Sequence, residues 1–147
     1  MKPAPHHLSY IFGGYDEHVL AYGPRDAERR ILIVPPLFDE MNRTRAVLVG
    51  AMRELAAQGV VTLLPDLPGC NESLAPVEQQ TLAGWRDAVH ACAEQHKASH
   101  MASIRGGTLI DAAITLPRWR LAPVKGASLL KTLLRTRVAA DKEAGKT

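Results

Sequence analysis

The sequence predicts an α/β fold with a mostly parallel, doubly wound sheet. Residues 31–34 and 60–64 are two apolar runs without alternation of polar and apolar side chains, which is typical of strands buried on both faces of a parallel sheet. Residues 45–58 between them carry apolar side chains at helical spacing. A third apolar run, at 101–104, follows a second helical segment. Strands and helices that alternate in this way form right-handed βαβ units.

The length of 147 residues is that of one domain, and a hydrophobic fraction of 46% excludes a wholly disordered chain. We expect a core over residues 1–126, followed by a basic amphipathic helix and tail over 127–147. Residues 118–147 hold eight basic and two acidic residues. The net charge of +3 is thus a property of the tail, and we expect no nucleic-acid partner.

The sequence also predicts the compartment and the absence of cofactors. It has no signal-peptide core and no apolar run of the ~20 residues that a membrane-spanning helix needs, so we expect a cytoplasmic protein. Cys70 and Cys92 lack zinc-ligand or CxxC spacing and are expected to be reduced. His90 and His96 have no matching ligand partner in the sequence, so we expect no metal and no cofactor.

The first thirty residues predict a hairpin and a loop. Residues 8–12 and 19–22 are short apolar pieces separated by Gly13 and Gly14, a pattern that indicates two edge strands. Residues 23–30 are then expected to form a loop.

Polar side chains follow the run at 31–34, where the carboxyl end of a parallel strand commonly meets a ligand. We take five residues here as ligand-binding candidates: Phe38, Asp39, Glu40, Asn42 and Arg45. The alternative is structural. Asn42 or Thr44 would cap the next helix, and the two acidic residues would sit near its positive end.

A second loop, 66–73, follows the run at 60–64 and adds Asp66 and Cys70 as candidates. A reactive cysteine needs a cationic neighbour or a helix N-terminus, whereas the nearest charges to Cys70 in the sequence are acidic, so a structural cysteine is favoured. Thr81 is expected to cap the following helix, whose apolar stripe is Leu82, Trp85, Val89, Cys92 and His96.

Residues 100–111 predict a strand, a sharp turn and the start of a helix, which we expect to continue through 111–116. The turn reads Ser103, Ile104, Arg105, Gly106, Gly107. Residues 119–122 predict one more short strand. Leu129, Leu130, Leu133, Leu134 and Val138 then form the apolar face of a basic helix at 127–140. Such a helix can contact a membrane peripherally, but more often it packs on its own domain or on a partner.

Four segments carry a resemblance to a known family: 35–45, 66–73, 104–107 and 123–130. Together they resemble the α/β-hydrolase-fold proteins called exosortase A system-associated hydrolase 2, which are encoded with bacterial exopolysaccharide and exosortase gene clusters. The resemblance implies the N-terminal half of a hydrolase fold, with β-α-β-α-β-α units and no complete C-terminal half. It also implies an oxyanion-hole loop at 36–41 and an ester or acyl hydrolase activity for the family.

The turn departs from the usual nucleophile elbow of that fold, G-x-S-x-G, because Arg105 occupies the nucleophile position. The resemblance implies that an arginine at this position is typical of the family. Arginine stays protonated and is no nucleophile. A catalytic triad in this fold needs a histidine after the elbow, but all six histidines precede Arg105. We therefore expect no Ser-Asp-His triad in this chain.

Three interpretations follow. In the first, Arg105 on the elbow binds a small anionic or acyl ligand, or forms a structural ion pair with Asp39 or Glu40. In the second, the chain is a truncated product whose open sheet edge favours self-association. In the third, it is a non-catalytic protein that docks on a protein partner through its basic helix.

Overall fold

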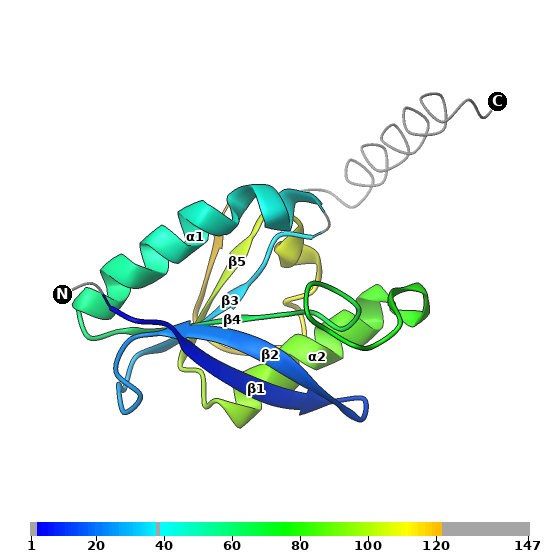
Figure 1. The fold of residues 1–147 in the computed structure, drawn as a ribbon, viewed down its shortest axis with the longest axis horizontal. Coiled ribbons are helices and arrows are strands. Elements are labelled where there is room, and N and C mark those ends of the chain that lie inside the picture. Colours follow the sequence, from blue (N-terminus) through cyan, green and yellow to red (C-terminus); the bar gives the residue numbers. More distant parts are fainter. Residues whose placement is uncertain (1–2, 38, 122–147) are drawn as a thin grey trace.

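The computed structural model describes residues 3–37 and 39–121. These residues form one mixed sheet with the strand order β1-β2-β4-β3-β5-β6 (Figure 1). The strands are β1 (His6–Phe12), β2 (Tyr15–Tyr22), β3 (Arg30–Val34), β4 (Val61–Pro65), β5 (His100–Ile104) and β6 (Arg118–Leu121). β1 and β2 are an antiparallel hairpin, and β2 pairs with β4 antiparallel, whereas β4, β3, β5 and β6 run parallel. The predicted fold class is confirmed.

Two α-helices cover opposite faces of the sheet: α1 (Asp39–Ala57) and α2 (Leu82–Gln95). Two short 3-10 helices, η1 (Val77–Gln79) and η2 (Arg105–Leu109), lie in the loops before α2 and after β5. Thr81 caps α2 as predicted, because its side chain accepts a hydrogen bond from the Gly84 backbone N–H at 2.9 Å. No helix in the described ranges is long and apolar enough to cross a membrane.

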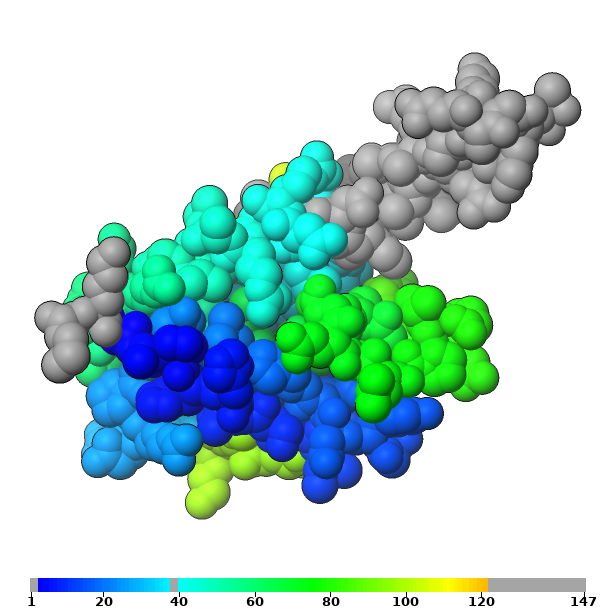
Figure 2. Space-filling view, viewed as in Figure 1, coloured from blue at the N-terminus to red at the C-terminus, as the bar shows by residue number. Residues whose placement is uncertain are grey.

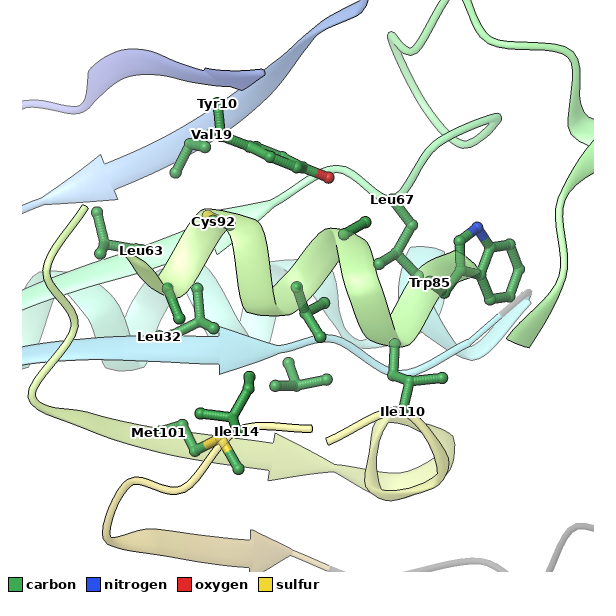
Figure 3. Packing of buried hydrophobic residues seen from close by; sticks show 14 of the residues in the cluster. Tyr10, Val19, Leu32, Leu63, Leu67, Trp85, Cys92, Met101, Ile110 and Ile114 are labelled. Carbon is green, nitrogen blue, oxygen red and sulfur yellow. The ribbon is translucent and has the colours of Figure 1, made fainter. Parts of the chain in front are cut away.

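The alternation of side chains along the central strands divides the core into two layers. Leu32 and Leu63 belong to the cluster with Trp85 and Cys92 of α2 (Figure 3). Their neighbours Ile33 and Leu64 turn to the other face and join the cluster with Leu48, Met52 and Ala56 of α1. Buried on both faces, these strands carry the continuous apolar runs that the sequence shows.

Cys92 gives this core a measurable pH dependence. Burial raises the pKa of Cys92 from its ordinary value of 9.0 to about 12. Between these values the unfolded chain loses the thiol proton and the folded chain keeps it, so this residue lowers stability by up to ~1.4 kcal/mol per pH unit as pH rises. We expect urea unfolding from pH 8 to 11 to give a shallower decline for Cys92→Ala. An unchanged decline would show that Cys92 titrates freely in the folded chain.

The first helix starts earlier than the sequence predicts. Asn42 and Thr44, proposed as caps, lie inside α1, which begins at Asp39. Thr44 instead donates a hydrogen bond from Oγ1 to the carbonyl oxygen of Glu40, one turn earlier, at 2.7 Å. The capping prediction for these two residues is therefore wrong, because the helix begins before both of them. The threonine hydroxyl bonds within the helix instead of capping it.

The predicted helix over 105–116 is also wrong. Only residues 105–109 are helical, as the 3-10 helix η2, and residues 110–117 are irregular, with a turn at 112–113. Residues 105–117 form the crossover from β5 to the parallel strand β6, and Pro117 directly precedes β6. The isoleucines Ile110 and Ile114 fix it by packing into the core beside Met101. The predicted last strand is confirmed as β6, and the basic segment 127–147 lies outside the described residues.

Candidate functional site

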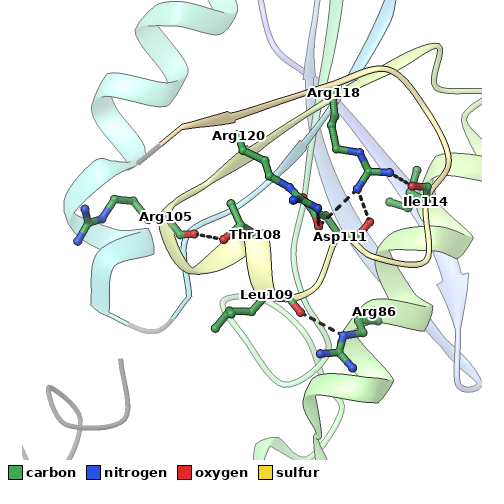
Figure 4. A network of polar contacts seen from close by, with 8 residues as sticks. All are labelled: Arg86, Arg105, Thr108, Leu109, Asp111, Ile114, Arg118 and Arg120. Carbon is green, nitrogen blue, oxygen red and sulfur yellow. Dashed lines mark hydrogen bonds and ion pairs between the residues drawn. The ribbon is translucent and has the colours of Figure 1, made fainter. Parts of the chain in front are cut away.

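Arg105 lies at a sharp turn where β5 meets η2. Its φ is 52°, in the left-handed region that non-glycine residues rarely adopt. Thr108 closes the turn by donating a hydrogen bond from Oγ1 to the Arg105 carbonyl oxygen at 3.0 Å (Figure 4). Strained backbone of this kind is common at functional sites.

The flanking small residues make this turn sterically feasible. Ser103, Gly106 and Gly107 are buried. A Cβ atom on Gly107 would lie 2.5 Å from the Pro35 carbonyl oxygen and 2.6 Å from that of Val34. The turn is thus pressed against the end of β3, as the elbow pattern in the sequence implies.

The Arg105 side chain forms an ion pair with Glu40 in the first turn of α1. Arg105 Nε donates to Glu40 Oε2 at 3.1 Å, and Nη2 donates to Oε1 at 3.2 Å. The hydrogen bond and the negative charge of Glu40 raise the pKa of Arg105, so the guanidinium stays charged. The arginine is 45% exposed and the glutamate 21%. Glu40, one of the two expected partners, therefore holds Arg105 in the structure.

The loop after β4 lies beside the start of α1 (Figure 2, green beside cyan). Asn71 joins the two: its Nδ2 donates to Asp66 Oδ1 at 3.1 Å and lies 3.4 Å from Met41 Sδ. Asp66 is buried, and its carbonyl oxygen accepts a hydrogen bond from the Tyr10 hydroxyl at 2.6 Å. Asp66 thus anchors the loop.

Cys70 in the same loop is half-buried. Burial, followed by the charges of Asp66 and Glu17, raises the pKa of Cys70. A nucleophilic cysteine needs the opposite shift, because the thiolate is the reactive form. The environment of Cys70 therefore favours the structural interpretation.

The remaining candidates contribute less to the geometry. Asn42 is exposed and Arg45 is partly buried on α1. Phe38 lies outside the described residues, as does the side chain of Asp39. In the described ranges no group of three or more histidine, cysteine, aspartate or glutamate residues could hold a metal ion.

Two buried carboxylates, Glu17 and Asp111, were not predicted from the sequence. Glu17 of β2 is fully buried, and its Oε1 accepts a hydrogen bond from the Ser73 hydroxyl at 2.9 Å. This contact ties the β4–α2 loop to the sheet. Asp111 is fully buried as well and pairs with Arg118 and Arg120 of β6. The alternating basic residues of β6 were the available signal for Asp111, whereas nothing in the local pattern marks Glu17 as buried.

Comparisons with known proteins establish the fold. No family model matches the sequence, and no curated protein matches it. Among solved structures, the chain is similar to a predicted CIB-like hydrolase from Thermoplasma acidophilum, with a TM-score of 0.64 and 14% identity over 86% of this chain and 67% of that one. The thioesterase domain of the curacin biosynthetic pathway gives a TM-score of 0.60 and 17% identity over 76% and 39%.

An epoxide hydrolase from Vigna radiata is similar with a TM-score of 0.57 and 16% identity, over 74% of this chain and 34% of the enzyme. The chain thus spans well under half of the thioesterase domain and of the epoxide hydrolase. At such identities the similarity concerns the fold alone. The described residues form part of the core of an α/β-hydrolase fold, with Arg105 at the turn that follows β5.

Proposed function

We propose that this chain is a hydrolase-fold protein of the exosortase-associated type whose elbow binds a small anion through Arg105 and does not attack it. The observation that carries the proposal is the half-exposed guanidinium of Arg105 on a strained turn at the carboxyl edge of the sheet. In open α/β sheets this edge is where ligands bind.

Glu40 supports the choice of ligand, since its carboxylate meets the guanidinium with both oxygens. This bidentate geometry suits carboxylate and phosphate groups alike. Because the pair is partly exposed to water, its strength is modest. A ligand anion can therefore replace Glu40 at little cost.

One observation argues against acyl transfer at this elbow. Arg105 cannot supply a nucleophile, and its pKa is raised further by Glu40. The resemblance to proteins of exopolysaccharide gene clusters favours an acidic sugar among the anions.

Thermal unfolding in the presence of glucuronate or inorganic phosphate tests the proposal. We expect both anions to raise the melting temperature of the native chain, because a ligand that binds only the folded state stabilises it. Arg105→Ala should abolish the shift. Glu40→Gln should enlarge it, because the internal competitor is gone while the side-chain shape is kept.

Arg29→Ala provides the matched control. Arg29 is an exposed arginine that precedes β3, at the opposite edge of the sheet from Arg105. Its loss removes the same charge and should leave the anion effect unchanged. Stabilisation that survives Arg105→Ala, or that Arg29→Ala reduces equally, would assign the effect to general charge and overturn the proposal.

Hydrolysis of p-nitrophenyl acetate distinguishes the enzymatic alternative, which the similarity of fold to a thioesterase and an epoxide hydrolase raises. We expect no turnover above the buffer rate. Turnover by the native chain that disappears in Arg105→Ala would show that the elbow is catalytic.

A further inference from the structure

β6 presents two chemically different faces. In its parallel pairing with β5, Arg118 and Arg120 lie opposite Met101 and Ser103. They point to the β5–β6 crossover, where both contact Asp111. Trp119 and Leu121 alternate with them and therefore face the side of the sheet that α1 covers. They are 54% and 53% exposed.

These two side chains border an apolar groove between α1 and the sheet. Val47, Ala51 and Leu55 line it from α1, and Ile104, Trp119 and Leu121 line it from the sheet. Its volume is about 480 Å³. Val47 is 75% exposed. Such a continuous apolar surface typically packs against another element.

The opposite face of β5 is already covered. Ile110 and Ile114 of the crossover are buried there in the cluster that contains Met101 and Trp85. Within residues 3–37 and 39–121, the uncovered part of β5 and β6 is thus their α1 side. A two-layer α/β core needs a covering element on that side.

We propose that residues 127–140 of the same chain occupy the apolar groove as a helix packed beside α1. Only residues 122–126 separate this segment from Leu121, which itself lines the groove. So short a connection gives the segment a high effective concentration at the groove. Two of its three basic residues, Lys131 and Arg135, would remain in water.

The length and the apolar pattern of residues 127–140 match those of the α1 side of the groove. A helix of 14 residues is ~21 Å long, against ~28 Å for the 19 residues of α1. Leu130, Leu134 and Val138 recur every four residues. On α1, Val47, Ala51 and Leu55 recur at the same interval. Matching rows of this kind interdigitate in helix packing.

Tryptophan fluorescence of the full chain tests the proposal. Trp85 is buried in the core, so acrylamide quenching reports mainly on Trp119. We expect Trp119 to be shielded in the native chain. Leu130→Glu should shift its emission to the red and raise quenching, because a charge would sit in the centre of the packed face. Ala51→Glu, at an exposed position of α1, should do the same from the groove side.

Thr132→Glu adds the same charge on the opposite side of the predicted helix and should leave Trp119 shielded. Light scattering should give the mass of a monomer throughout. Identical quenching in the native chain and in both groove variants would overturn the proposal. Shielding that appears only with a doubled mass would assign the groove to a second copy, and shielding that requires anionic phospholipid vesicles would assign it to a membrane. Either result also rejects the internal occupant.

Discussion

Gly107→Ala is expected to destabilise the chain by about 3 kcal/mol or more, because overpacking against rigid atoms is among the costliest substitutions. The added Cβ would lie 2.5 Å and 2.6 Å from two carbonyl oxygens at the end of β3. Both are backbone atoms, so no side-chain rotation relieves the overlap. The turn and the strand would have to separate, and the Arg105 side chain would move with them. Urea unfolding followed by circular dichroism measures the loss.

Gly50→Ala provides the control for the same chemical change. Gly50 lies inside α1, and a Cβ atom there would meet nothing within 4 Å. Alanine is favoured over glycine inside a helix, so this variant should gain about 0.5–1 kcal/mol. If Gly107→Ala were as stable as the native chain, the elbow would not press against β3 in solution.

The second large effect is expected for Asp111→Ala. Asp111 is fully buried and holds Arg120 with both carboxylate oxygens, at 2.9 Å and 3.1 Å, while Arg118 Nη1 lies 3.5 Å from Oδ1. Its removal leaves two arginines beside β5 without their counter-charge (Figure 4). Breaking a fully buried pair costs about 3–5 kcal/mol. Because both arginines keep contact with water, we expect a loss of about 2–3 kcal/mol on that scale.

Glu40→Ala is the comparison for Asp111→Ala. It removes a carboxylate from another two-pronged arginine pair, but at a partly exposed position. Exposed pairs contribute little to stability, so the urea midpoint should barely change. The large loss for Asp111→Ala should also persist in 1 M NaCl, since buried charges are weakly screened. Equal losses for the two variants would contradict the difference in burial on which this prediction rests.

The sheet was predictable because β3 and β4 at its centre are buried on both faces. Such strands carry continuous apolar runs, and both of these runs became strands. The elbow was predictable for a steric reason: its small residues are required by the close approach of Gly107 to β3. In both places the local sequence and the tertiary packing favour the same structure.

The details that were missed, left open or wrong depend on tertiary contacts. The crossover after η2 lacks an α-helix because its isoleucines reach the core and Asp111 pairs with β6. The choice of Glu40 as the partner of Arg105 requires α1 to begin next to the elbow. The burial of Glu17 depends on Ser73, which lies in another loop. Apart from the alternating basic residues of β6, which signal a partner for Asp111, these contacts leave no periodic signal in the sequence.

The order of the strands also dictates when the chain can fold during synthesis. β3 lies between β4 and β5, and Ile31 pairs with both Thr62 and His100. The centre of the sheet is therefore incomplete until His100 has been added to the growing chain. The β1–β2 hairpin forms from local contacts, but an isolated hairpin is only marginally stable in water. Pairings so distant in sequence form slowly, so the nascent chain exposes apolar strands until its last central strand has left the ribosome.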